Sequence, residues 1–348
     1  MNRFAALVLC SLSATIPDAS RADSSSGFAL SLPPQDPPIE VLFEFDTYDI
    51  NSIDSITETF ELNGVMTLQW QDQRAAFDPL SEGVHEKIFQ GTYQVSEVAA
   101  SWFPQVVIMN DSGMDVRTGS QLRIRPDGTS TLTEKVTAVV EADLNMRKFP
   151  FDAHRLEAVF TVLGHDDNEV ILKIHPGSIS EPTTPMDVPG WSIDSVSQSV
   201  SETRDTAGGS VVLGISVARE ASYIRRLITL PMFVIVLLSF SIFWMDKSSL
   251  SDRNAVSFLG VLTGVTFQQT VVTLVPPVSY ITLMHAFLFI SFFAMAATVP
   301  VNFAVSNMDR KGMTEAGDRI DLRCRWLFPL VYISLVLLVT GIALARNT

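Results

Sequence analysis

Cysteine is nearly absent from this sequence of 348 residues, which contains only Cys10 and Cys324. No disulfide can cross-link the long segment between them, so that segment must fold on a hydrophobic core of its own. Histidine is almost as scarce: the five histidines occur singly, without metal-ligand spacing, and neither G-x-S-x-G nor H-E-x-x-H is present. We predict no enzymatic activity, assign no metal site and expect no cofactor.

Basic residues are scarce in residues 1–222, which contain 14 of them against 32 acidic residues and so carry a net charge of −18. A surface of this sign repels nucleic acid and anionic lipid and attracts cations. We therefore exclude nucleic acid as a partner and expect cations to approach this part of the chain.

Charged residues are missing altogether from four apolar runs, residues 227–244, 254–275, 281–305 and 326–345. A helix rises about 1.5 Å per residue, so each run can cross a hydrocarbon core of roughly 30 Å. We predict a membrane domain over residues 223–348, in contact with lipid. Its helices are expected at about 225–244, 252–275, 280–305 and 325–345.

The N-terminus has the pattern of a secretory signal, which we assign to residues 1–22. Arg3 precedes the apolar run Ala5–Leu12, and small residues surround a cleavage point after Ala22. The alternative is a fifth membrane anchor, which is disfavoured because the run is too short to span a bilayer. Residues 23–39 are rich in Ser and Pro and are expected to form a flexible lead-in.

Residues 40–222 alternate apolar and polar side chains in short segments, which is the pattern of half-buried β-strands. The segments are residues 41–45, 60–70, 121–125, 131–140, 156–162, 170–174 and 210–217. Pro126-Asp127-Gly128 lies between two of them and predicts a hairpin turn. We predict an all-β, immunoglobulin-like sandwich ectodomain, followed by an all-α four-helix transmembrane domain.

The loops set the expected topology. With the N-terminus exported, residues 245–253 and 306–325 form cytoplasmic loops. The second loop contains five basic residues, as the positive-inside rule requires, whereas Arg225 and Arg226 on the outer side oppose the rule. We keep the orientation that the signal sets, with the ectodomain outside the membrane.

The second apolar run differs from the others because it carries a polar stripe. Four of its residues are spaced i, i+3, i+4 and i+7 and so share one helix face; they are Thr266, Gln269, Thr270 and Thr273. The same line continues toward the cytoplasm through Ala255, Leu259 and Leu262 and ends near Asp252.

Several copies of this helix around an axis would form a gated pore. The polar half would be wetted, Leu259 and Leu262 would form a hydrophobic constriction, and Asp252 would form a carboxylate ring that favours cations. Two other interpretations stay open. The stripe could hydrogen-bond neighbouring helices, and Asp252 could occupy a helix N-terminus because an acid is favourable there.

Seven motifs, in order along residues 41–345, resemble those of pentameric ligand-gated ion channels, the family of nicotinic receptors and their bacterial relatives. They are Trp70-Gln71-Asp72-Gln73-Arg74, Trp102-Phe103-Pro104 with Asn110, Pro126-Asp127-Gly128, Phe149-Pro150-Phe151-Asp152, Leu230-Pro231-Met232, Ser251-Asp252-Arg253, and Arg323-Cys324-Arg325 with Phe328-Pro329. We call residues 149–152 the hallmark loop. The resemblance implies a homopentamer, in which four identical subunits join this one.

The resemblance is to the bacterial branch of that family. In animal members two cysteines flank the hallmark loop, whereas the matching positions here hold Ala142 and Leu156. The branch implies a multi-pass protein of the bacterial inner membrane, with a periplasmic ectodomain.

The resemblance also implies roles for single residues in the second helix. The pore-lining positions would be Ala255, Leu259, Leu262, Thr266, Gln269 and Thr273. Leu262 matches the central gate of the family. Asp252 matches an acidic position associated with cation selectivity, so Na⁺ and K⁺ are the expected permeant ions.

A second set of residues is expected to couple the ectodomain to the pore. They are Asp54, Pro150, Phe151, Asp152, Arg219, Pro276 and Pro277. The resemblance pairs Asp152 with Arg219, and a partly buried pair there would fix the two domains relative to each other. The alternative is an exposed pair of little energetic value.

The stimulus that opens such a channel stays open between a small ligand and protons. Amine-binding members use an aromatic cage, but residues 192–222 contain no aromatic residue, and Leu163 and Val65 replace two further cage positions. Glu58 matches an acid implicated in proton sensing, although it could equally be a solvated acid at a strand end. His285 could respond to pH or could be a neutral histidine hydrogen-bonded between helices, and Gly264 replaces a histidine of the acid-gated relative.

Two other functions compete with a channel. One is a non-conducting membrane sensor, and the other is an anchored extracytoplasmic binding protein. The predicted cytoplasmic loops have nine and about twenty residues, which offers little for signalling to a cytoplasmic partner.

Overall fold

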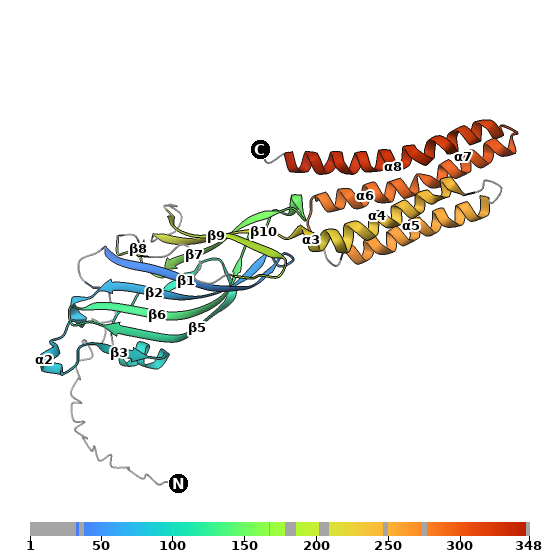
Figure 1. The fold of residues 1–348 in the computed structure, drawn as a ribbon. Coiled ribbons are helices and arrows are strands. Elements are labelled where there is room, and N and C mark those ends of the chain that lie inside the picture. Colours follow the sequence, from blue (N-terminus) through green and yellow to red (C-terminus); the bar gives the residue numbers. More distant parts are fainter. Residues whose placement is uncertain are drawn as a thin grey trace, which may run out of the picture.

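The computed structural model describes residues 33–34, 38–99, 101–166, 168–177, 186–201, 209–245, 250–272 and 277–345. The predicted signal and most of the lead-in lie outside the described residues, as do Thr273 and Pro276. Figure 1 shows a β-rich part joined end to end with a bundle of long helices.

The β-rich part is a sandwich of two sheets, as the alternating pattern predicted. One sheet has six strands in the order β3-β5-β6-β2-β1-β8, and the other has four in the order β4-β7-β10-β9. The strands are β1 Ile39–Asp54, β2 Thr59–Gln71, β3 Lys87–Gln90, β4 Val106–Ile108, β5 Asp111–Ile124, β6 Thr129–Glu141, β7 Ala153–Val162, β8 Val170–Ile174, β9 Trp191–Ser201 and β10 Ser210–Arg219. A single helical turn, α2 Pro79–Glu82, follows β2.

The core lies between the two sheets, where inward-pointing side chains of alternating residues meet. The rings of Phe43 and Phe45 from β1 lie 4.9 and 5.1 Å from the ring of Phe160 on β7. All three are buried. These contacts close the sandwich without a disulfide.

The predicted hairpin joins β5 to β6. Gly128 has a φ of 84°, which favours glycine, and its amide donates to the Arg125 carbonyl at 2.9 Å. A Cβ at Gly128 would collide with the backbone oxygen of Asp72, which cannot move aside as a flexible side chain could. The turn therefore requires glycine for both conformation and space.

Strands β3, β4 and β9 were not among the predicted segments. β3 and β4 have only four and three residues, too few to show a period. β9 is rich in serine, and its buried residues do not alternate regularly, because it lies at the edge of its sheet beside β10.

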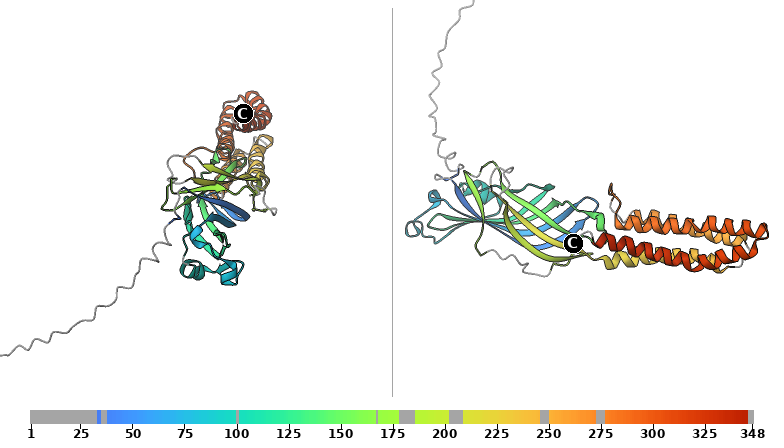
Figure 2. Two further views of the ribbon diagram at one scale, coloured as in Figure 1. Left: turned by 90° about the vertical axis from the view of Figure 1, so that its left-hand side faces the viewer. Right: turned by 90° about the horizontal axis from the view of Figure 1, so that it is seen from above.

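Four helical spans long and apolar enough to cross a membrane make up the described bundle: Ala221–Trp244, Ser251–Val272, Leu283–Arg310 and Thr314–Ala343. The first combines α3 Ala221–Ile224, a π-helical turn Arg225–Thr229, α4 Leu230–Phe240 and a 3₁₀ turn Ser241–Trp244. The others are α5 Leu250–Val272, α6 Leu283–Ala296 with α7 Thr298–Arg310, and α8 Thr314–Ala345. Figure 2 shows the bundle as a continuation of the sandwich's long axis.

The predicted loop over residues 306–325 is wrong, because most of it is helical. α7 continues to Arg310 and α8 begins at Thr314, so only Lys311, Gly312 and Met313 connect them. Outside the hydrocarbon, a helix can continue through charged residues. The ion pair between Glu315 and Arg319 has the i,i+4 spacing of neighbours on a helix. The fourth helix thus starts eleven residues before the predicted 325.

Two other predicted bounds also change. The first span begins at Ala221, so the boundary predicted between 222 and 223 falls inside a helix. The third span runs from Leu283 to Arg310 instead of 280–305 and is interrupted at Ala297.

Candidate functional site: the α5 helix and the domain junction

One face of α5 packs inside the subunit. Ser257 accepts a hydrogen bond from Asn302 of α7 at 2.8 Å, and both side chains are buried. A Cβ at Gly260 would collide with the hydroxyl of Ser239 on α4. This face therefore contacts the first and third spans at close range.

The predicted pore-lining stripe lies on exposed surface of α5. Every member that the structure describes is exposed, and the exposed fraction of Leu262 reaches 64%. They are Ala255, Leu259, Leu262, Thr266 and Gln269. The Thr266 hydroxyl donates to the Leu262 carbonyl at 3.0 Å, so α5 itself provides that partner. Thr273 lies outside the described residues.

Asp252 is exposed in the first turn of α5. An acid there also interacts favourably with the N-terminal end of the helix dipole. The position and exposure of Asp252 are therefore compatible with a carboxylate ring at a pore and with an acid that stabilises a helix N-terminus.

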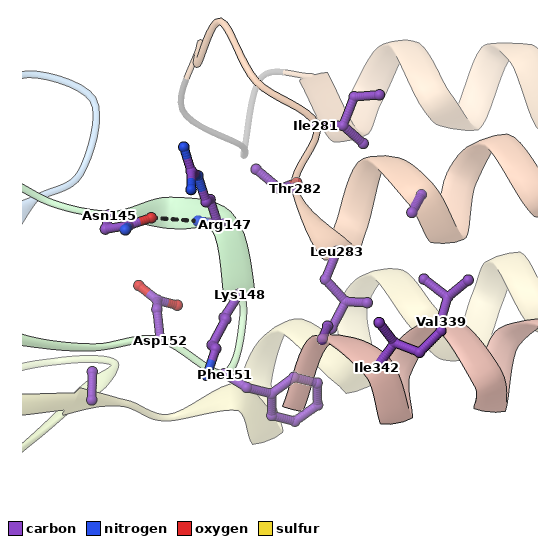
Figure 3. A pocket seen from close by; sticks show the side chains of 13 residues that line it. Asn145, Arg147, Lys148, Phe151, Asp152, Ile281, Thr282, Leu283, Val339 and Ile342 are labelled. Atoms are coloured by element: carbon purple, nitrogen blue, oxygen red, sulfur yellow. Dashed lines mark hydrogen bonds between the residues drawn. The ribbon is translucent and has the colours of Figure 1, made fainter. Parts of the chain in front are cut away.

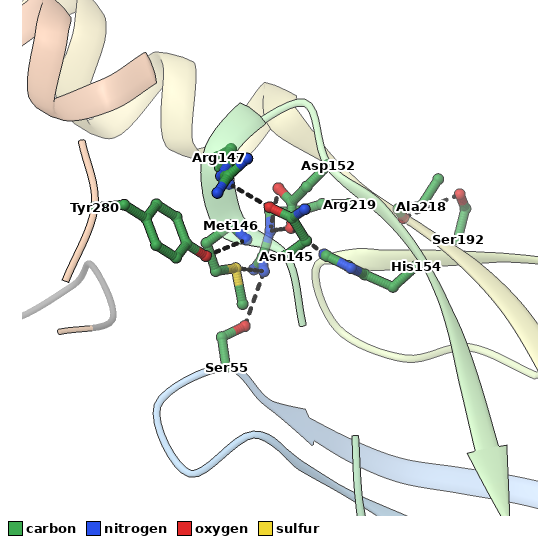
Figure 4. A network of polar contacts seen from close by, with 10 residues as sticks. All are labelled: Ser55, Asn145, Met146, Arg147, Asp152, His154, Ser192, Ala218, Arg219 and Tyr280. Atoms are coloured by element: carbon green, nitrogen blue, oxygen red, sulfur yellow. Dashed lines mark hydrogen bonds and ion pairs between the residues drawn. The ribbon is translucent and has the colours of Figure 1, made fainter. Parts of the chain in front are cut away.

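The second candidate site is the junction between the sandwich and the bundle, where Asp152 and Arg219 meet (Figure 4). Strands β7 and β10 pair so that Ala153 lies opposite Ala218, which places Asp152 beside Arg219. The Arg219 Nε donates to both carboxylate oxygens of Asp152, at 3.0 and 3.1 Å. Asp152 is 3% exposed, so the pair is not the exposed alternative.

Three further residues complete what we call the junction network: Ser55, His154 and Trp191. The His154 Nε2 lies 2.7 Å from Asp152 Oδ2, and the ring of this buried histidine meets Trp191 edge-on at 5.8 Å. The Arg219 guanidinium lies 4.0 Å from the Trp191 ring centre, and its Nη2 donates to the Ser55 hydroxyl at 2.8 Å. Arg219 thus links β7, β9 and the loop between β1 and β2.

The environment of Asp152 keeps it ionised. Burial by itself would raise its pKa, but hydrogen bonds from His154 and Arg219 and the charge of Arg219 outweigh burial, and the pKa lies below its usual 3.8. A lowered pKa means that the stability from Asp152 is fully present above the unfolded pKa and is lost as the pH falls through the folded value.

We therefore predict that acidification to pH 5 leaves the junction intact. The lower thermal midpoint of Asp152→Asn relative to the wild type should persist from pH 8 to about pH 5, above the usual pKa of 3.8. Thermal unfolding of the detergent-solubilised protein at each pH measures it. A difference that vanishes by pH 5 contradicts the prediction.

The 3₁₀ turn Met146–Lys148, which precedes the hallmark loop, contacts the segment just before the third span. The amide of Met146 donates to the hydroxyl of Tyr280 at 2.8 Å, and the Arg147 guanidinium lies 5.4 Å from the same ring. Tyr280 follows Pro277, which is exposed, and precedes α6. These contacts are therefore made by the turn before the hallmark loop, and they reach Tyr280, three residues beyond Pro277.

A cavity of about 800 Å³ lies beside this contact (Figure 3). Lys148 and, from the hallmark loop, Phe151 line one side, and Leu283 of α6 and Ile342 of α8 line the other. The loop therefore faces the outer ends of the third and fourth spans without filling the space between them. Pro150, inside the loop, follows a cis peptide bond.

The remaining predicted residues lie apart from the Asp152–Arg219 pair. Asp54 accepts backbone hydrogen bonds from Ile56 and Thr57, of which the first does most to lower its pKa. Glu58 is exposed in the same loop with a φ of 54°. The contact of Arg219 with this loop is made by Ser55.

Among the described residues, His285 forms its side-chain hydrogen bonds with Thr282, whereas one interpretation expected a bond to another helix. Its Nδ1 lies 2.8 Å from the Thr282 hydroxyl, and the Thr282 hydroxyl accepts from the His285 amide at 3.2 Å. The two residues form a capping box at the start of α6. Thr282 precedes the helix by one residue, so the bond is local.

The sequence interpretation missed His154, Trp191, Ser55 and Tyr280. His154 could have been predicted from the sequence. It follows Asp152 by two residues, and side chains two apart on a strand point to the same face. The other three come from distant segments and carry no local pattern.

One family model and two relatives are similar to this chain in sequence. The family model described as the neurotransmitter-gated ion-channel ligand binding domain matches residues 25–212. A proton-gated ion channel of Gloeobacter violaceus is 27% identical over 275 residues, which cover 77% of this chain and 74% of the relative. The gamma-aminobutyric acid receptor subunit gamma-3 of Homo sapiens is 26% identical over 270 residues, 74% of this chain and 56% of the receptor subunit.

Proposed function

This chain belongs to the neurotransmitter-gated ion-channel family, and from that premise we propose that five identical copies form a cation-selective channel whose pore is lined by α5. The ectodomain receives the stimulus, and Leu262 with Leu259 forms the gate.

The observation that carries this proposal is the contrast between α5 and α8, which lie on opposite sides of the bundle (Figure 1). Both expose most of their length. Apart from Ser334, the exposed residues of the outer half of α8 are apolar or glycine, such as Leu337, Leu338 and Ile342, and suit lipid. The exposed line of α5 instead includes Thr266 and Gln269, and polar side chains at membrane depth require water or polar partners.

A pentamer would give the exposed faces of both α5 and α8 a suitable environment. Five α5 helices around the axis would place Thr266 and Gln269 in water and the α8 helices against lipid. Leu259 and Leu262 would then form apolar rings toward the cytoplasmic side, where a narrow pore can dewet. Asp252 would form a ring of carboxylates at the cytoplasmic mouth.

The test of cation selectivity is the reversal potential of the purified protein in planar bilayers under a KCl gradient. Replacing Asp252 by asparagine should lower the ratio of cation to anion permeability about fivefold or more, and Asp252→Lys should reverse the preferred sign. Glu315→Lys is the matched control, because Glu315 is an exposed acid of the same cytoplasmic end. An unchanged reversal potential in Asp252→Lys contradicts the proposal.

Two classes of stimulus fit the ectodomain, a small ligand and protons. One relative is described as a proton-gated ion channel and another as a gamma-aminobutyric acid receptor subunit. Current recorded during a scan of pH, calcium, amines and carboxylates separates the classes. A proton-gated channel opens on acidification, with a midpoint that Glu58→Gln shifts. If no stimulus gives current and the protein is monomeric in detergent, a sensor or binding protein replaces the channel.

A further inference from the structure

The start of α5 carries two adjacent charges of opposite sign, Asp252 and Arg253. If both faced the pore, each subunit would contribute no net charge there, and five copies would not select cations. Cation selectivity through Asp252 therefore requires that the positive charge of Arg253 be compensated elsewhere.

The two side chains have different surroundings. Successive residues of a helix point about 100° apart, and here Asp252 is exposed whereas the Arg253 side chain is 2% exposed. The Arg253 Nη2 donates to Asp321 Oδ1 of α8 at 2.7 Å, and the Asp321 side chain is 6% exposed. The partner of Arg253 thus comes from a helix 68 residues away.

The surrounding contacts hold α8 in this position. One turn after Asp321, the Arg325 Nη2 donates to the Phe243 carbonyl at 3.0 Å, at the cytoplasmic end of the first span. The Arg325 guanidinium also lies 5.2 Å from the Trp244 ring centre. Asp321 is therefore fixed beside the start of the pore helix.

We propose that Asp321 determines ion selectivity as a positioning residue, by compensating Arg253 inside each subunit so that the Asp252 carboxylates set the sign of the field at the cytoplasmic mouth. The inference rests on the proposed function. A close ion pair acts at a distance as a dipole, whose field falls off faster than that of a single charge. Without Asp321, five buried and weakly screened guanidinium charges would oppose the five carboxylates.

The experiment measures reversal potentials in bilayers under a KCl gradient at low ionic strength. Asp321→Asn should lower the ratio of cation to anion permeability about fivefold. The double variant Arg253→Gln/Asp321→Asn removes both charges and should return the ratio to within about twofold of the wild type. Glu315→Gln removes an exposed acid from the same helix without touching Arg253, and should leave the ratio unchanged.

The outcomes separate this role from a structural one, because a merely destabilised subunit lowers the number of channels and not the reversal potential. An unchanged ratio in Asp321→Asn overturns the proposal. So does an equal fall in the single and double variants, since Asp321 would then act on the ions directly.

Loss of a buried partner could prevent Asp321→Asn from assembling. The double variant then decides: a ratio near that of the wild type supports the proposal, and a shifted ratio overturns it. Failure of the proposed function is distinguishable, because the wild type itself would then conduct no current or prefer anions.

Discussion

Replacing Asp152 by asparagine is expected to abolish the evoked current of this channel. The change leaves the buried guanidinium of Arg219 without its carboxylate and puts a neutral amide in place of the carboxylate beside His154. Breaking one side of a buried ion pair costs about 3–5 kcal/mol. Current evoked by the activating stimulus, divided by the amount of protein at the cell surface, measures the effect.

Two controls separate loss of coupling from loss of folding. Glu157→Gln breaks the pair with Arg155, which lies on the same strand but is 51% exposed on both sides, so it should cost less than about 1 kcal/mol and leave the current intact. His154→Gln keeps an amide donor toward Asp152 and should retain most of the current. Normal current per surface channel in Asp152→Asn would show that the pair does not couple the domains.

Replacing Leu262 by threonine is expected to open the channel without any stimulus. Each leucine side chain favours an apolar environment by about 2 kcal/mol, so a ring of five exposed Leu262 residues keeps water out of the constriction. A threonine hydroxyl at each position binds water and lets the constriction fill. We expect a standing leak current and a shift of the activation midpoint by about tenfold or more. Whole-cell recordings before and after the stimulus measure both.

Val261→Thr is the matched control for this prediction. Val261 is the preceding residue, is partly buried and packs against the core of its own subunit. The same polar group there should leave the closed channel free of leak. Equal leak from both variants, or none from Leu262→Thr, would place the gate elsewhere.

The sequence sufficed for the layers of this molecule because their signals are local and periodic. The alternation over residues 60–70 becomes β2 with buried and partly exposed residues in strict alternation. The Pro126-Asp127-Gly128 turn and the four runs without charges are local sequence signals of comparable strength. The spacing of the α5 stripe was likewise enough to select residues that share an exposed face.

The junction could be predicted only in part. Family resemblance supplied Asp152 and Arg219, but Ser55 reaches Arg219 across 164 residues, and Tyr280 reaches Met146 across 134. Contacts of this separation depend on how the two domains meet, which no local pattern encodes. Asp321 was missed for the same reason, since an acid in a predicted loop gives no sign of a buried partner.

The three-residue connection between α7 and α8 has a consequence for motion. Lys311, Gly312 and Met313 leave the two helices little freedom to separate. The ion pair of Arg253 with Asp321 and the bond of Ser257 with Asn302 then attach the start of α5 to the same hairpin. The cytoplasmic ends of three helices form one stiff block, so we expect α5 to open the pore by tilting about this end, with the larger displacement at its outer end.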